Sequence, residues 1–359
     1  MSVDFDLSED QRHFQSAVEA LLADLCTPQQ LLTTFDTPAM DAATWQGLQA
    51  LGVPGMMIPE AHGGLGLQAL DAAVVAEVMG RFAAPAAFAE HVVGGAAIVE
   101  GGGEALRERW LPPLAAGKAR ITASFLEGGE AWAPDSWTVA AGPRISAVRP
   151  HVPWSDGMDL LLVGLAGGRL GVVEVDTPGV TVEPAAAFDP THRLATVRLD
   201  NVPCTVLGGD LALAWRLFDL WSLLLAADAV GGAQRCLRET VAFVQERVQF
   251  GVPVGRFQAV KHQLAELALQ IEPLAGLYWY AAHGWDNHLT DSAIAAARAK
   301  AHSSEVYANS VRRSIELHGG VGYTWEFGTH IWLRRSIFDR QFLGTPARHR
   351  ARLAELSGW

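Results

Sequence analysis

Apolar side chains recur at the helical spacing of three or four positions near both ends of the chain. Near the N-terminus, Ser8-x-x-Gln11 has the form of a helix-capping box, and an apolar stripe follows it. Further helices are expected in this part at 41–51, 71–81, 85–100 and 104–116. Beyond residue 210, helices are expected at 211–249, 258–288, 291–318 and 329–340. The chain is therefore predicted to begin and end in helical domains.

Between these helical parts the helical period gives way to short runs of β-forming residues, which Gly, Pro and Asp separate. The runs lie at 120–125, 138–141, 160–165, 169–175, 180–184, 195–199 and 205–207. Short strands at this spacing are typical of a small β-barrel or sandwich. The pattern predicts an α+β fold with an N-terminal helical domain at 1–118, a middle β domain at 119–210 and a C-terminal helical bundle at 211–359.

Composition narrows the class of protein. The 359 residues are 50% apolar, which is enough for a large core in two or three domains. No apolar run reaches the ~20 residues of a membrane span, and the acidic N-terminus lacks the form of a signal peptide. Cys26, Cys204 and Cys236 show no metal-ligand spacing, so a reducing cytoplasm is expected. The net charge of −12 argues against nucleic acid as a partner.

Polar side chains gather where two of the expected helices meet. Arg247, Gln249 and Phe250 precede a Gly/Pro turn, and Gln258 opens the next helix. A corner with a guanidinium and several amides can hold an anion. From the spacing alone, an ordinary helical hairpin with an exposed polar bend is the simpler interpretation.

The literal motifs favour a specific family. The string R-x-Q-F-G-x-P-x-G-x-F-Q-x-x-K-H, which starts at Arg247, closely resembles the C-terminal segment of acyl-CoA dehydrogenases. Leu317-His-Gly-Gly-Val-Gly-Tyr-Thr-Trp-Glu326 and the loop from Ile58 to Gly66 are similar to further motifs of that family. The resemblance covers essentially the whole chain. It implies the three-domain acyl-CoA dehydrogenase fold with a four-helix C-terminal bundle, an FAD cofactor and α,β-dehydrogenation of an acyl-CoA.

The resemblance also shows what is missing for catalysis. A carboxylate must remove the α-proton, and the flavin N5 must receive the β-hydride. At the two positions where the family places its base, this chain has Leu343 and Trp221, which cannot accept a proton. Asp219 is a weak substitute, since it lies about 200° around the helix from Trp221. Asp228 is the other candidate, although it is equally consistent with a buried hydrogen-bonded group.

The platform for the flavin ring is absent as well. The family has a T-E-P-x-x-G-S-D loop and a W-I-T tripeptide in the middle domain. The matching segments here are 122–131, without Pro or Ser-Asp, and His151-Val152-Pro153. Proline has neither a hydroxyl group nor a backbone N–H, so Pro153 cannot make the threonine contact to N5.

The motifs for the adenosine end of FAD are largely kept. The resemblance implies that Arg247, Gln249, Phe250 and Gln258 contact the pyrophosphate and adenosine of an FAD held mainly by another subunit. Paired glycines allow close backbone approach to a diphosphate. The same segment has Glu316 in place of the usual Gln, which would require neutralisation by Arg247 or Arg312. The remaining cofactor-side positions are Gly319, Gly320 and Thr345.

The remaining basic residues have simpler interpretations. No metal site is expected at His318, His330 or His349, because none has a second ligand at helical spacing, so hydrogen-bonded or solvated imidazoles are expected. Arginines near the C-terminus are interpreted as a solvated or interface face, with binding of a CoA phosphate as the alternative. They are Arg334, Arg335, Arg340, Arg348 and Arg350.

Some bacterial members of the family, acting on bulky steroid-type CoA thioesters, are α₂β₂ heterotetramers in which one subunit lacks the base. Their C-terminal run is similar to Gly344-Thr-Pro-Ala-Arg-His-Arg350. The leading hypothesis is therefore the non-catalytic subunit that completes the FAD site of such an enzyme. Two alternatives stay open. One is a self-sufficient homomeric dehydrogenase with an atypical base, and the other is a non-redox CoA-thioester-binding or scaffold protein.

Overall fold

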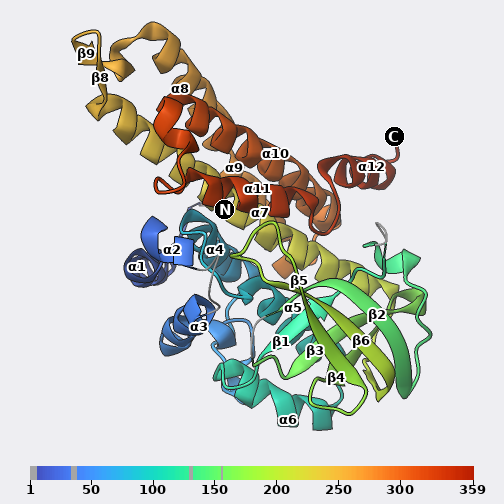
Figure 1. The fold of residues 1–359 in the computed structure, drawn as a ribbon. Helices are drawn as coiled ribbons and strands as arrows, with labels where there is room; N and C mark the ends of the chain where they lie inside the picture. The colour runs from blue at the N-terminus through green and yellow to red at the C-terminus, as the bar shows by residue number, and fades with distance from the viewer. Residues whose placement is uncertain (1–5, 34–38, 129–131, 155–156) are drawn as a thin grey trace.

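The computed structural model describes residues 6–33, 39–128, 132–154 and 157–359 (Figure 1). The chain first forms a helical layer. Its helices are α1 (Glu9–Leu25), α2 (Pro28–Thr33), α3 (Ala39–Ala50), α4 (Ala69–Arg81), α5 (Phe88–Gly101) and α6 (Glu104–Ala115). The predicted capping box of α1 is confirmed, since the Ser8 hydroxyl accepts from the Gln11 N–H and the Gln11 side chain accepts from the Ser8 N–H.

Two small sheets follow and pack face to face. The strands are β1 (Ile121–Ser124), β2 (Arg144–Pro153), β3 (Leu160–Leu165), β4 (Arg169–Glu174), β5 (Val180–Ala185), β6 (Leu194–Pro203) and β7 (Thr205–Val206). One sheet has the order β1-β3-β4-β7 and the other β2-β6-β5. A separate apolar cluster fills the space between them, with Val163, Val173 and Val197 among its buried members. The predicted β-sandwich is confirmed.

The last part of the chain is a helical bundle. It consists of α7 (Leu211–Glu246), the hairpin β8 (Val248–Gln249) and β9 (Val252–Pro253), α8 (Gln258–Ile271), α9 (Leu274–Asp286), α10 (Ser292–His318), α11 (Thr329–Gln341) and α12 (Pro346–Leu356). Figure 1 shows α7 running from beside the sheets to the hairpin at the opposite end of the molecule. The helix–β–helix order agrees with the predicted fold class.

Some details differ from the sequence prediction. The expected helix at 258–288 is two helices, because Pro273 stands at the start of α9 and cannot donate a backbone hydrogen bond within a continuous helix. The expected strand at 138–141 is irregular, and β2, which was not predicted, begins at Arg144. The helix α12 was also missed, although Thr345 caps it and Pro346 opens it.

A buried ion pair joins the three parts of the chain. Arg335 on α11 donates to both carboxylate oxygens of Asp228 on α7. It also donates to the carbonyl oxygen of Ala84 after α4 and to the hydroxyl of Thr191 in the loop before β6. One guanidinium thus fixes the positions of both helical layers and the β layer.

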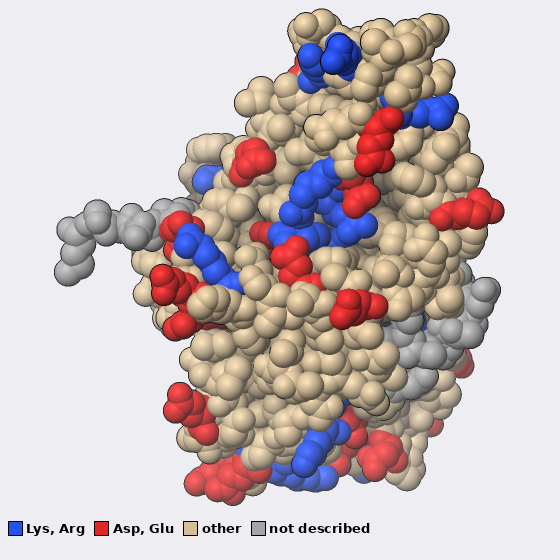
Figure 2. Space-filling model, turned by 90° about the vertical axis from the view of Figure 1, so that its left-hand side faces the viewer, with Lys and Arg blue, Asp and Glu red and all other residues tan. Residues whose placement is uncertain are grey.

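Acidic and basic side chains lie close together on one face of the molecule (Figure 2). Figure 2 shows Asp and Glu side chains beside the Lys and Arg side chains on the face that carries α1 and α2. None of the helices among the described residues combines the length and the apolarity that crossing a bilayer requires.

Candidate functional site

The corner after α7 is a short hairpin with exposed polar side chains. Phe250 at its turn has a φ of 54° and is 93% exposed. Arg247 and Gln249 are exposed, and within the described residues the Arg247 guanidinium has no hydrogen bond or ion pair. Gln258, also exposed, opens α8. These four side chains therefore lie on the surface of the chain and are not packed into its core.

The end of α10 lies against the last turns of α7. The rings of Phe243 and His318 are in contact, with centroids 4.3 Å apart. Arg247 follows Phe243 by about one helical turn, and Gly319 follows His318 directly. The contact therefore brings the two motifs singled out in the sequence to the same end of the bundle.

The glycine segment after α10 presents an open backbone. Gly319 has a φ of 63°, and neither Gly319 nor Gly320 has another atom within 4 Å of the place where a Cβ would stand. Nearby, the Glu316 carboxylate accepts from Arg313 at 3.0 Å. The expected neutralisation by Arg247 or Arg312 is wrong, because Arg313 lies three residues away on the same helical face.

Trp221 stands at one of the two positions where the family resemblance would place a base. Its side chain is fully buried, and its ring centroid lies 5.4 Å from that of Phe125 and 5.2 Å from that of Phe342. Phe342 in turn packs edge-on against Trp132 at 4.8 Å. The region where a base would stand is an aromatic core that joins α7, the β layer and the segment after α11.

Leu343 stands at the other position where the family resemblance would place a base, and it is equally inaccessible. It is 1% exposed, and its φ of 59° is unusual for a residue with a branched side chain. The Nε2 of the buried His349 donates to the Leu343 carbonyl oxygen at 3.1 Å. The loop is thus held in place with an apolar side chain directed into the interior.

Neither aspartate near these positions is a free base. Asp219 is held by Arg352, which donates to both carboxylate oxygens, one of them at 2.9 Å. Burial raises the pKa of Asp219, and the contact with Arg352 opposes this effect. Asp228 is the partner of Arg335, so the prediction of a buried hydrogen-bonded group at Asp228 is confirmed.

The segments that match the flavin platform bond to each other. The Thr122 hydroxyl donates to the Pro153 carbonyl oxygen at 2.6 Å, and both side chains are buried. The pairing of β2 with β6 is irregular just before Pro153, where His151 has a φ of 51°. Residues 129–131 of the first segment lie outside the described part of the chain.

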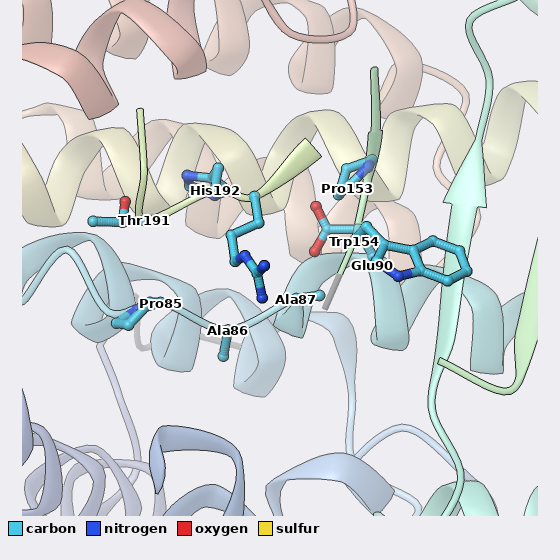
Figure 3. A pocket seen from close by; sticks show the side chains of 9 residues that line it. Pro85, Ala86, Ala87, Glu90, Pro153, Trp154, Thr191 and His192 are labelled. Carbon is cyan, nitrogen blue, oxygen red and sulfur yellow. The ribbon is translucent and has the colours of Figure 1, made fainter. Parts of the chain in front are cut away.

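Sequence reasoning did not find Glu90, the buried carboxylate of α5. It lines two cavities of about 20 Å³ each, together with Ala86 and His192. Figure 3 shows its carboxylate directed into the space below the loop that carries Thr191 and His192. Burial raises the pKa of Glu90, while His192 opposes this effect. A single acidic residue within the apolar run 86–98 was the available signal.

The C-terminal arginines do not form one surface. Arg335 is buried in its pair with Asp228, so the expectation of a solvated or interface residue is wrong for it. Its charge is matched by an acidic side chain on another helix, which periodicity within one segment does not reveal. Arg340 and Arg350 both contact Glu305, and Arg334 donates to the Phe188 carbonyl oxygen.

A larger cavity of about 280 Å³ lies beside the Leu343 loop. It is bounded by α7 and α12 and has both aromatic and charged walls, among them Trp132, Trp215, Arg348 and Glu355. The buried His349 also lines it, and burial lowers the pKa of His349 to about 3, so this imidazole is neutral at physiological pH.

Two family models match the chain. The model described as "Acyl-CoA dehydrogenase, N-terminal domain" matches residues 8–118, and "Acyl-CoA dehydrogenase, C-terminal domain" matches residues 211–357. A curated relative, acyl-CoA dehydrogenase IpdE2 of Mycolicibacterium smegmatis, is 29% identical over 352 residues, which cover 97% of this chain and 98% of the relative.

Solved structures agree with these matches. A variant of the Tcur3481-Tcur3483 steroid ACAD superposes with a TM-score of 0.90 at 31% identity, covering 98% of both chains. The ChsE4-ChsE5 complex from Mycobacterium tuberculosis contains a chain of the same fold, with a TM-score of 0.88 at 22% identity and 99% coverage of both chains.

Proposed function

We propose that this chain, which belongs to the acyl-CoA dehydrogenase family, is the base-less subunit of a heteromeric FAD-dependent enzyme of that family. The observation that carries the proposal is the burial of Trp221 and Leu343 at the two base positions. A partner of the same family would supply the base and the platform for the flavin ring. The assembly would be an α₂β₂ tetramer, and its location the cytoplasm.

The residues present fit one end of FAD and not the other. On the adenosine side, Arg247 and Phe250 are exposed, and the backbone at Gly319 and Gly320 is open to a diphosphate. On the ring side, Thr122 is bonded to Pro153, and Trp221 lies in a closed aromatic core. This chain would therefore hold the adenosine end of a cofactor whose ring lies in the partner.

The residues proposed on the cofactor side of this chain would each have a definable part. FAD, when bound, supplies the acceptor for the hydride from the substrate. Arg247 would balance diphosphate charge, and the amides of Gln249 and Gln258 would orient the cofactor by hydrogen bonds. Phe250 would cover an apolar face, and Thr345 would remain in its capping role on α12. No residue of this chain moves the substrate proton in this scheme.

The substrate class is inferred from the relatives. One of the similar solved structures is described as a steroid ACAD, so a bulky, steroid-type acyl-CoA is the substrate we assign to the complex. The domain boundaries after residues 118 and 210 remain part of the proposal. The matches to the N- and C-terminal family models, at 8–118 and 211–357, are consistent with them.

The visible absorption spectrum tests the proposal. It is measured on the chain purified alone and on the chain purified after co-expression with a complete family member encoded beside it. We expect no flavin band and no turnover for the chain alone, and about one FAD per two chains in a mixed tetramer. Turnover of an acyl-CoA by the pure chain would contradict the proposal. A full flavin complement in the pure chain would favour the self-sufficient homomeric enzyme.

One observation favours a second function. The cavity of about 280 Å³ beside Leu343 has aromatic walls and an exposed arginine, Arg348, at its rim. Such a lining can take an amphipathic ligand without redox chemistry, as the non-redox CoA-thioester-binding alternative requires. Tetramers that form without flavin, even beside candidate partners, would support this second function over the first.

A further inference from the structure

A cavity of about 200 Å³ with both polar and apolar walls lies beside the glycine segment that follows α10. Residues of α2, α7, α10 and α11 line it, including His318, Thr329 and Glu239, and so does Glu326 of the loop before α11. None of the residues assigned above to the cofactor or to the base positions lines this cavity. Its chemistry can be derived from the hydrogen bonds that its walls already make.

Two buried hydrogen-bonding atoms in the wall have no partner within the described residues. His318 is 5% exposed, and its Nδ1 lies 2.7 Å from the Ser314 carbonyl oxygen, so Nδ1 carries the proton and Nε2 presents a lone pair. That Nε2 is unpartnered, as is the Oγ1 of the buried Thr329. A buried polar atom without a partner destabilises the folded chain, so both atoms favour a hydrogen-bonding occupant.

The fixed charges of the cavity leave one carboxylate unbalanced. Arg235 contacts Glu239 at 3.1 Å and lies over the Trp332 ring, so these two charges neutralise each other. Glu326 lines the same cavity, is exposed, and has no ion pair within the described residues. The cavity therefore offers an anionic acceptor, a neutral imidazole acceptor and a hydroxyl.

Exposed apolar side chains surround this cavity on one side. They lie on the loop between α10 and α11, and Tyr323 is 74% exposed. Phe327 belongs to this loop and also lines the cavity. The exposed side chains are Val321, Tyr323, Trp325 and Phe327. An exposed aromatic patch around a polar pocket is typical of a protein interface more than of a small-molecule site.

We propose that this cavity receives a lysine side chain of the partner subunit, and that the loop 321–327 packs on the surface around that lysine. The proposal rests on the heteromeric function proposed above. A lysine ammonium has three N–H donors, which match the Glu326 carboxylate, the His318 Nε2 and the Thr329 hydroxyl. Its aliphatic stem would lie along Phe327 and Trp332.

The first test measures the dissociation constant of the heteromer with Glu326→Gln, which keeps the shape and removes the charge. We expect at least about a tenfold weaker complex, because a charge-assisted contact at an interface is lost. Thr329→Val tests the contribution of the Thr329 hydroxyl in the same way. Glu108→Gln, an exposed carboxylate on α6, is the matched control and should leave the dissociation constant unchanged. Thermal melts of each variant establish that it is folded.

The second test identifies the occupant. A carbodiimide joins a carboxylate to a primary amine in direct contact, so mass spectrometry should find Glu326 linked to a partner lysine. Wild-type affinity for both Glu326→Gln and Thr329→Val would overturn the inference while leaving the proposed function standing. Weakened binding without the cross-link would overturn lysine as the occupant. If the wild-type chain forms no flavin-containing heteromer, the proposed function fails first.

Discussion

Arg352 on α12 holds Asp219 on α7 through both carboxylate oxygens, and both residues are largely buried. The guanidinium also lies over the Trp215 ring, at 4.1 Å from its centroid. Both carboxylate oxygens of Asp219 therefore already have hydrogen-bond donors from the guanidinium. Asp219 therefore joins the C-terminal helix to the bundle, and we expect it to have a structural role.

Asp219→Asn should leave dehydrogenation by the heteromer unchanged and reduce stability. The substitution removes the charge and one acceptor from a buried pair, at a cost of about 1–3 kcal/mol in the free energy of unfolding. Chemical denaturation gives that cost, and steady-state assay of the flavin-loaded complex gives the activity. Glu355→Gln on the same α12 serves as the control. A large loss of turnover with normal stability would restore Asp219 as a candidate base.

Trp221 acts as a core residue, and its substitutions should behave accordingly. Trp221→Ala would leave a large void and cost about 3–5 kcal/mol of stability. Trp221→Phe should cost about 1 kcal/mol or less, because the indole Nε1–H has no partner among the described residues and its loss relieves an unsatisfied donor. Urea denaturation separates the two outcomes. Equal losses for both variants would contradict the assignment of Nε1–H as unsatisfied.

Local periodicity was enough to predict most of the fold. The strand at 160–165 and the helix from 211 were predicted because each is long or purely apolar. The break at Pro273 was missed because the apolar stripe continues on both sides of it, so the period alone does not reveal the interruption. The helix α12 was missed because its surface is strongly basic, and only its Thr345 cap and Pro346 indicated where it begins.

The site could be predicted only where it depends on residues close in sequence. The polar corner at Arg247 and the glycines at 319–320 are local motifs, and the structure places them at one end of the bundle. The pairs Asp219–Arg352 and Asp228–Arg335 join residues more than a hundred positions apart. Such contacts depend on how α11 and α12 pack, so the pattern of a single segment does not contain them.

Arg247→Gln should weaken the retention of FAD by the heteromer. Loss of a charge-assisted contact to a diphosphate corresponds to about a 10- to 100-fold increase in the dissociation constant of the cofactor. Flavin fluorescence during dilution measures this constant. Arg256→Gln is the matched control, because Arg256 is also exposed and lies in the same turn. Equal effects of the two substitutions would show that Arg247 contributes only general positive charge.

Glu90 should make the protein less stable as the pH rises. Burial raises the pKa of this carboxyl group in the folded state, so the unfolded chain releases the proton first. Stability is then lost from about pH 4.3, the ordinary carboxyl value, up to the raised pKa of the folded state. Glu90→Gln should flatten this loss and raise the melting temperature at neutral pH. An unchanged slope of stability against pH would exclude Glu90 as its source.

His349 should produce the opposite dependence at acidic pH. Burial, helped by the nearby Lys300 and Arg352, lowers the pKa of His349 to about 3, against about 6.5 in an unfolded chain. Between these values the unfolded state binds the proton and the folded state does not, so stability falls as the pH is lowered from about 6.5 towards 3.

His349→Gln keeps a donor for the Leu343 carbonyl oxygen and removes the titration. Melting temperatures from pH 7.5 to 4 should therefore fall less steeply for the variant than for the wild type. At pH 7.5 the His349 imidazole is neutral in both the folded and the unfolded wild-type chain, so the difference in melting temperature between the two proteins there measures the substitution alone. Parallel curves for the two proteins would contradict a buried neutral imidazole at this position.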